Sequence, residues 1–117
     1  MIVVVGGMKR SGSTWLYNVA RVAMEHAGLE PKVGEYDLFA QGAQPPLLIK
    51  QHWWKPDLAE AADVVLSSVR DVEGVHESLR AFWGREPTAR ELAKIVAHWQ
   101  RWSEVANYEM PYEDLLD

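Results

Sequence analysis

The chain has 117 residues, of which 48% are hydrophobic and 25% charged, and its formal net charge is -5 at pH 7. These values predict one globular domain over residues 1–117, and the negative charge excludes general attraction to nucleic acid or anionic membranes. The absence of cysteine excludes disulfides and thiol chemistry, and no window approaches the roughly 20 apolar residues of a membrane span. We therefore expect a soluble, cytoplasmic protein without nucleic-acid or membrane partners.

The first part of the chain predicts a strand, a glycine-rich loop and a helix. Residues 2–5, "IVVV", are a continuous β-branched run, typical of a strand buried on both faces of a parallel sheet. Two glycines end this run, and apolar residues at helical spacing predict a helix over residues 13–28. Prolines and glycines interrupt residues 30–46, which predict a loop with at most a short strand over 33–36.

The rest of the chain predicts two further buried strands and three helices. We expect the strands over residues 46–52 and 63–69, and the helices over 56–62, 71–83 and 87–106. Thr88 and Glu91 form a capping box at the start of the last helix. The alternation of strands and helices predicts an α/β fold, a three-layer sandwich on a mostly parallel sheet with a P-loop-like phosphate-binding loop.

The loop "GGMKRSGSTW" (6–15) has most features of a phosphate-binding loop. Gly7 and Gly12 keep the spacing of its two glycines, and the free N–H groups of a following helix can hold a phosphate. The lysine that should follow Gly12 is missing, and no Walker B carboxylate is evident, which disfavours a site built around ATP and magnesium. Lys9 and Arg10 supply positive charge instead.

Polar residues follow the other two buried strands, at the edge where parallel sheets bind ligands. Lys50 and His52 stand at the end of one strand, and Arg70 directly follows the next. Because side chains alternate along a strand, Lys50 and His52 project to the same side, where a neutral histidine can act as a general base. A lone histidine is also compatible with a structural role, and a glycine pair with a tight turn, so the residues alone leave these alternatives open.

Three motifs, in this order, resemble those of the sulfotransferases that use 3′-phosphoadenosine 5′-phosphosulfate (PAPS). "KRSGSTW" (9–15) resembles their 5′-phosphosulfate loop, "IKQH" (49–52) the segment with the catalytic base, and "RDVEGVHES" (70–78) the 3′-phosphate motif. "YEDLL" (112–116) is similar to a further segment of the family. The resemblance implies an enzyme that moves a sulfuryl group from PAPS to a hydroxyl or amine of a small-molecule or carbohydrate acceptor. It would release 3′-phosphoadenosine 5′-phosphate (PAP) and need no metal ion.

The resemblance also implies a role for each residue that matches a motif. His52 would be the base, and Lys50 and Arg10 would stabilise the transferring group. The residues implied to hold the donor are Ser11, Gly12, Ser13 and Thr14 in the loop, Trp15 against the adenine, and Arg70 and Ser78 at the 3′-phosphate. Trp53 and Trp54 follow the base directly and are therefore the candidates for the acceptor side.

The chain departs from the family's pattern at several points. Lys9 and Val72 stand where prolines are usual, and two tryptophans follow His52 where Leu-Pro is common. The basic segment that covers the donor in the family has no counterpart before Asp117, so we expect a minimal or truncated member. Completion of the site by a second subunit of a homo-oligomer stays open. Two other functions also stay open: a non-catalytic PAP- or nucleotide-binding module, and a P-loop small-molecule kinase.

The remaining aromatic and histidine residues predict structural or surface roles. Trp99 and Trp102 lie on the apolar stripe of the last predicted helix and are expected in the core. His76 and His98, like His26, lie on predicted helices without evident partners and are expected in solvent. The acidic segment 112–117 is expected to be a solvated terminal turn.

Overall fold

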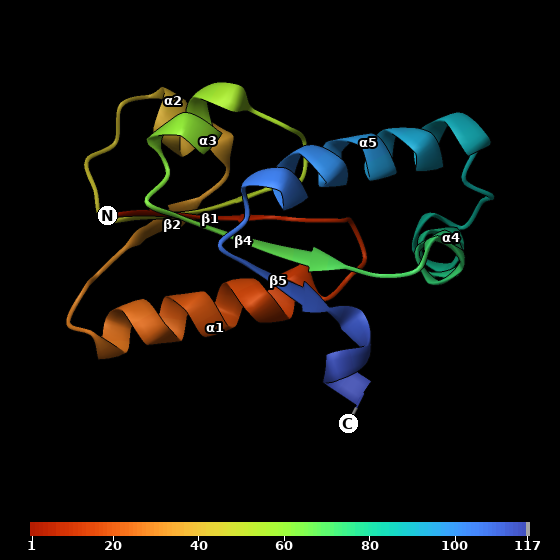
Figure 1. Cartoon of the computed structure of the whole chain (residues 1–117), viewed down its shortest axis with the longest axis horizontal. Coiled ribbons are helices and arrows are strands. Elements are labelled where there is room, and N and C mark those ends of the chain that lie inside the picture. Colours follow the sequence, from red (N-terminus) through yellow and green to blue (C-terminus); the bar gives the residue numbers. More distant parts are fainter. Residues whose placement is uncertain (117) are drawn as a thin grey trace.

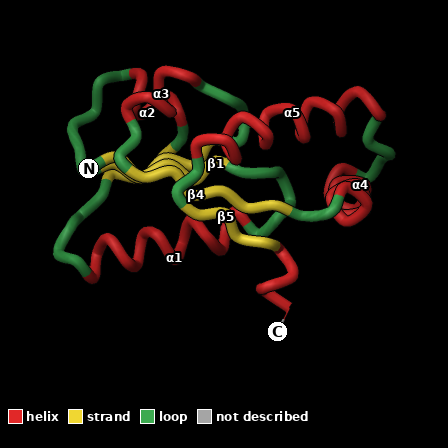
Figure 2. Tube along the Cα trace, in the orientation of Figure 1, coloured by secondary structure: helices red, strands yellow, loops and turns green. Residues whose placement is uncertain are grey.

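The computed structural model describes residues 1–116 and confirms the predicted α/β fold, with a five-stranded, all-parallel sheet in the order β2-β3-β1-β4-β5. Helix α1 covers one face of the sheet, and α2, α3 and α5 cover the other (Figure 1), with the strands forming the middle layer (Figure 2). The strands are β1 (Ile2–Gly6), β2 (Lys32–Gly34), β3 (Leu47–Gln51), β4 (Val64–Val69) and β5 (Tyr108–Pro111). The helices are α1 (Ser13–His26), α2 (Tyr36–Ala40), α3 (Pro56–Ala61), α4 (Val72–Trp83), α5 (Ala89–Val105) and the 3-10 helix η1 (Tyr112–Leu116).

Strand β1 and the first three residues of β3 are apolar because helices cover the sheet on both sides. Val3 and Val5 of β1 pack towards α1, whereas Val4 packs with Leu58 and Trp102 on the opposite face. The neighbouring β3 alternates in the same way and is fully buried from Leu47 to Ile49. These strands therefore form a rigid centre whose carboxyl ends carry the predicted functional residues.

Helix α4 stands beyond the carboxyl end of β4 and forms a wall next to the glycine loop. Its N-terminus is fixed by Asp71, whose side chain accepts a hydrogen bond from the Gly74 N–H at 2.9 Å. A separate apolar cluster joins α4 to the loop and to α5, and its buried members are Met8, Val75, Leu79 and Ile95. The predicted capping box at Thr88 and Glu91 of α5 is confirmed by both of its hydrogen bonds.

The structure contains two elements that the sequence pattern did not predict. Strand β5 pairs with β4, with Leu66 opposite Tyr108, and α2 occupies part of a segment expected to be loop. Both elements are short, and β5 ends in a proline, so neither has a strong local signal. The short strand expected over 33–36 is found as β2, which ends earlier, because α2 already begins at Tyr36.

The expectation of a solvated terminal turn is only partly correct: Glu113 and Asp114 are exposed, whereas Tyr112 and Leu115 are partly buried. Tyr112 of η1 lines a cleft at the carboxyl ends of the strands, and Leu115 packs against the core cluster that contains Leu16 and Met110. Asp117 lies outside the described residues. None of the helices within residues 1–116 has both the length and the apolar character to cross a membrane.

Candidate functional site

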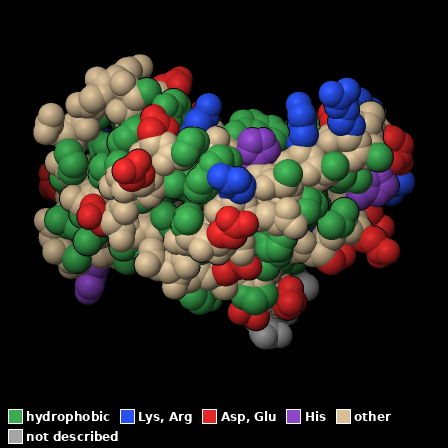
Figure 3. Space-filling view, turned by 45° about the horizontal axis from the view of Figure 1, so that its top comes forward, with side chains coloured by type: hydrophobic (Ala, Val, Ile, Leu, Met, Phe, Trp, Pro, Cys, Tyr) green, Lys and Arg blue, Asp and Glu red, His purple; other side chains and the backbone are tan. Residues whose placement is uncertain are grey.

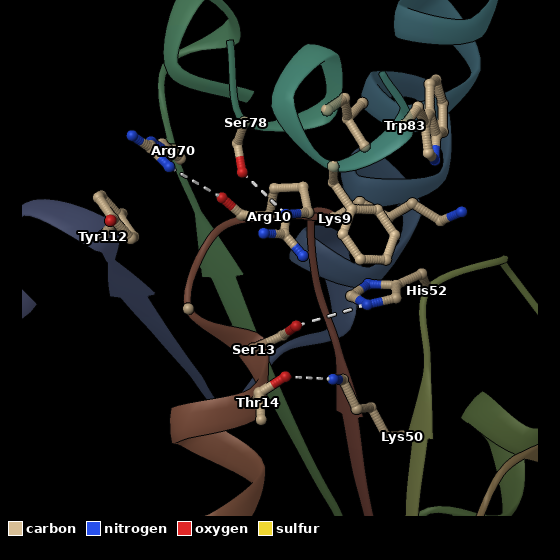
Figure 4. A pocket seen from close by; sticks show the side chains of 13 residues that line it. Lys9, Arg10, Ser13, Thr14, Lys50, His52, Arg70, Ser78, Trp83 and Tyr112 are labelled. Carbon is tan, nitrogen blue, oxygen red and sulfur yellow. Dashed lines mark hydrogen bonds between the residues drawn. The ribbon is translucent and has the colours of Figure 1, made fainter. Parts of the chain in front are cut away.

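A cleft of about 380 Å³ opens where β1, β3 and β4 end, at the edge predicted from the sequence. Figure 4 shows side chains from the glycine loop, from β3 and the residue after it, and from α4 pointing towards one another across this cleft. The lining residues are Lys9, Arg10, Gly12, Ser13, Thr14, Lys50, His52, Arg70, Ser78, Leu79, Phe82, Trp83 and Tyr112. The structure thus brings together residues from all three predicted motifs.

The glycine loop is held in a fixed conformation by residues that pack against it on the side away from the cleft. Gly12 has a φ of +86°, a backbone conformation that favours glycine, and the ends of the Leu115 and Met110 side chains occupy the space where a Cβ would lie. Ser11 is fully buried, and its hydroxyl donates to the Met8 carbonyl and lies 2.7 Å from Oγ of Ser68. The Ser11 side chain therefore anchors the loop, and only its backbone can serve the cleft.

The loop leads directly into α1, whose first N–H groups have no partner within the helix. Ser13 and Thr14 occupy the first two helical positions, where these groups and the helix dipole favour an anion. Nζ of Lys50, on β3, donates a 2.7 Å hydrogen bond to Oγ1 of Thr14. This contact holds the lysine against the start of the helix, and burial lowers the pKa of Lys50, with Glu35 opposing and Arg10 adding to the effect.

His52 is held as a neutral imidazole with a defined free nitrogen. Nδ1 of His52 lies 3.0 Å from the carbonyl oxygen of Gly7, and because a carbonyl can only accept, Nδ1 must carry the proton. Nε2 is then unprotonated and lies 3.4 Å from Oγ of Ser13 at the cleft (Figure 4). Burial lowers the pKa of His52 to about 4, and the charges of Lys50 and Lys9 contribute in the same direction. At neutral pH the ring is therefore uncharged, with Nε2 unprotonated.

The other side of the cleft joins the loop to the predicted 3′-phosphate motif. Nε of Arg10 donates a 2.8 Å hydrogen bond to Oγ of Ser78, a residue 68 positions away in the sequence. Nη1 of Arg70 donates to the backbone carbonyl of Arg10 at 3.3 Å, and the Arg70 guanidinium lies 3.9 Å from the ring centroid of Tyr112. Figure 4 shows Arg10 between these residues and His52. The polar groups of both motifs thus converge on one space.

The lining of the cleft is strongly positive although the chain is acidic. Four lining residues are cations, Lys9, Arg10, Lys50 and Arg70, and none of the described residues that line the cleft is a carboxylate. The chain as a whole carries a formal charge of -5, and acidic side chains are spread over the face shown in Figure 3. Within residues 1–116, no group of three or more His, Asp or Glu side chains could hold a metal ion. The cleft is therefore suited to an anion held by cations and N–H groups.

The three tryptophans implicated by the sequence occupy different environments. Trp15 is 51% exposed on α1 and is not among the residues that line the cleft, in contrast to Ser13 and Thr14 just before it. Trp54 lies edge-on against the buried Trp102, with ring centroids 4.8 Å apart. Trp53 borders a second hollow of about 260 Å³, which Lys9, Lys50 and His52 also line. Trp53 is thus the tryptophan of this pair that stands next to the candidate base.

Sequence reasoning missed several lining residues and misjudged two histidines. Phe82, Trp83 and Tyr112 line the cleft, and of these only Tyr112 had a signal, because it begins the "YEDLL" segment. His98, expected in solvent, accepts a 2.7 Å hydrogen bond from the Trp54 N–H at its Nδ1. His76 pairs with Glu86 at 2.7 Å.

Comparison with known protein families and with curated proteins gives no match for this chain. The site therefore rests on its own residues: a neutral imidazole, two arginines and two lysines around a glycine loop at the start of a helix.

Proposed function

We propose that this chain is a PAPS-dependent sulfotransferase that transfers a sulfuryl group to a hydroxyl or amine of a small-molecule or carbohydrate acceptor. One observation carries the proposal. Three motifs that resemble those of this family, separated by long stretches of sequence, line a single cleft, and the Arg10–Ser78 hydrogen bond joins the first motif to the third. The parallel sheet alone brings the strand-end residues Lys50, His52 and Arg70 to one edge, but it does not account for Ser78, which lies within α4 and bonds to the glycine loop.

The residues present fit the donor. PAPS carries two phosphate-containing groups and supplies the sulfuryl group. The loop N–H groups before Ser13 and Thr14 suit its 5′-phosphosulfate, and Arg70 with Ser78 suits its 3′-phosphate. The cleft, at about 380 Å³, falls within the range of about 300–1,000 Å³ usual for ligand sites. Arg10 and Lys50 now donate to neutral hydroxyls, which an anionic oxygen outcompetes as an acceptor.

The chain's own groups then have distinct tasks. His52 accepts at Nε2 the proton of the acceptor's hydroxyl or amine, and its Nδ1–H bond to the Gly7 carbonyl stabilises the positive charge that the ring gains. Lys50 and Arg10 stabilise negative charge that develops on the transferring group and on the departing phosphate. Trp53 offers an indole surface to the acceptor beside His52.

A kinase built on the same loop would need groups that this cleft lacks. Magnesium with ATP is usually held by a carboxylate, and among the described lining residues there is none. The position after Gly12 is Ser13, so the lysine that reaches the outer phosphates of ATP is also missing. The composition of the cleft thus favours a metal-free transfer over a kinase.

The test is calorimetric titration of the purified protein with PAP, and in parallel with ADP and with ATP plus magnesium. We expect PAP to bind with a clear preference over ADP, because only PAP carries a 3′-phosphate, and labelled PAPS then to support transfer in an acceptor screen. Binding of ATP with magnesium but not of PAP would overturn the proposal in favour of a kinase. Binding of PAP with no turnover for any acceptor would instead favour a non-catalytic nucleotide-binding module.

A further inference from the structure

Helix α5 holds the segment that carries His52 through two hydrogen bonds from one of its faces. Nε1 of Trp102 donates to the backbone carbonyl of His52 at 3.2 Å, and Nδ1 of His98 accepts from the backbone N–H of Trp54 at 2.7 Å. His98 and Trp102 are four residues apart, so they lie on the same face of the helix, one turn from each other. The two bonds therefore secure the backbone on both sides of Trp53.

Trp102 also contacts the other partner of the base. Its ring is fully buried and lies against Gly6, where a Cβ would overlap the indole atoms. The next residue is Gly7, whose carbonyl accepts the hydrogen bond from Nδ1 of His52. A single indole thus bonds to the His52 carbonyl and lies against Gly6, the residue before the one that accepts from the imidazole.

Aromatic packing strengthens the same arrangement. The rings of Trp54 and Trp102 are edge-on at 4.8 Å, and those of Trp53 and His98 are edge-on at 4.7 Å. Burial and the nearby Lys94 and Lys55 lower the pKa of His98, which favours the neutral ring that can accept the Trp54 N–H.

The base needs such support because its strand has already ended. Strand β3 pairs with β1 up to Gln51, opposite Gly6, and His52 lies beyond the last paired residue. A catalytic group must be held within a fraction of an ångström of its working position, and groups outside a ladder need another source of rigidity. Helix α5, on the face of the sheet opposite α1, provides this rigidity.

We propose that Trp102 and His98 are positioning residues for His52, and that their hydrogen bonds to the His52 carbonyl and the Trp54 N–H keep the imidazole on the Gly7 carbonyl with Nε2 facing the cleft. The role of His52 as base rests on the function proposed above, whereas the positioning of its ring does not depend on it. Neither residue contacts the transferring group.

The test uses variants that remove one hydrogen bond while keeping the helix. Trp102→Phe keeps an aromatic ring on Gly6 but loses the N–H donor, and His98→Leu removes the acceptor. His98→Asn retains an acceptor in the side-chain oxygen and serves as the rescue. Trp99→Phe is the matched control, because Trp99 is on the same helix but donates to Glu109, at 3.0 Å, and not to the His52 segment.

The first readout is NMR titration of protein labelled with ¹⁵N in histidine, which reports the tautomer and midpoint of His52 without any ligand. In the wild type and in Trp99→Phe we expect His52 to carry its proton on Nδ1 and to titrate with a midpoint of about 4. In Trp102→Phe and His98→Leu we expect mixed tautomers and a midpoint closer to the ordinary value of about 6.5, with recovery in His98→Asn. If Trp102→Phe fails to fold, His98→Leu with His98→Asn decides the question.

The second readout is turnover with labelled PAPS together with calorimetric titration of PAP. The two positioning variants should lose about tenfold or more in kcat while the affinity for PAP stays unchanged, because a misplaced base slows only the transfer. Folded variants with an unchanged His52 tautomer and midpoint would overturn the positioning role. A wild type that neither binds PAP nor turns over would contradict the proposed function alone, since the NMR readout would still decide the role of α5.

Discussion

The two sides of the cleft are held in place in different ways. On the arginine side, Arg10 and Arg70 are held by polar contacts with Ser78, with a backbone carbonyl and with the Tyr112 ring, in partly exposed surroundings. On the other side, His52 is held by the Gly7 carbonyl and by a helix whose contact residue, Trp102, is fully buried. The contacts of the arginine side can be exchanged for contacts with an anion, whereas the His52 side is set by packing.

Replacing His52 tests the proposed general base on the buried side of the cleft. His52→Ala should lower kcat about 10²–10⁴-fold, the usual contribution of a positioned general base. The affinity for PAP should change little, because His52 is neutral and the proposal assigns the phosphates of the donor to other groups of the cleft. Initial rates with labelled PAPS and calorimetric titration of PAP measure the two effects. His76→Ala is the control, since His76 pairs with Glu86 outside the cleft, and equal turnover in the two variants would contradict the role of His52.

The burial of His52 should also make stability depend on pH. Its pKa is about 4 in the folded chain and about 6.5 when unfolded, so between these values the unfolded chain binds the extra proton. The contribution of neutral His52 to the free energy of unfolding is complete above pH 6.5 and is lost as the pH falls towards 4. The loss is at most about 1.4 kcal/mol per pH unit and about 3 kcal/mol in all. Urea unfolding of the wild type and of His52→Ala across this window measures it. The same slope in both proteins would show that His52 is not held in its neutral form.

Replacing Arg70 tests the exposed, charged side. Arg70→Ala should reduce the preference for PAP over ADP about 10–100-fold, because a charge-assisted contact to the 3′-phosphate is lost. Competition titrations of both nucleotides measure the preference, and kcat at saturating donor should change less than in His52→Ala. Arg80→Ala is the control, since Arg80 pairs with Glu86 at the surface of α4. An unchanged preference for PAP over ADP in Arg70→Ala would show that Arg70 does not bind the 3′-phosphate.

Gly6 tests the packing beneath the buried side. Gly6→Ala should lower the free energy of unfolding by about 1–3 kcal/mol, because the new methyl group overlaps the Trp102 ring and something must shift. Gly34→Ala is a matched control, since Gly34 also ends a parallel strand but its Cβ would meet only the flexible Leu38 side chain, at 3.3 Å from Cδ2. Urea unfolding of both variants gives the comparison. Equal losses would mean that Trp102 does not press on the end of β1.

Much of the frame could be predicted from local pattern because it depends on local physics. The β-branched run of β1 and the apolar runs of β3 and β4 predict buried strands more strongly than any other structure. The capping box likewise marks the start of α5 within the sequence itself. Strand β5 could not be found in this way. It is four residues long, and its only reason to be extended is the ladder with β4, about 40 residues earlier in the chain.

The candidate site divides along the same line. The positions of Lys50, His52 and Arg70 followed from the rule that parallel strands present ligand-binding residues at their carboxyl ends, and the structure brings these three to one cleft. Tyr112, by contrast, lies at the cleft only because β5 delivers η1 to the glycine loop. The resemblance of the "YEDLL" segment singled out this residue, but local pattern could not place it at the cleft, because that contact depends on where β5 pairs.

What the sequence alone determined is the order of strands, loops and helices and the side of the sheet on which chemistry can occur, since periodicity and strand direction are local properties. The tertiary structure decided between neighbours that look alike in the sequence. Trp53 and Trp54 both follow His52, yet Trp53 borders the hollow beside the base whereas Trp54 packs against Trp102. Both residues lie in the connection after β3, which bends at Trp53, and the position of Trp102 on α5 determines that Trp54 is the one that packs inward.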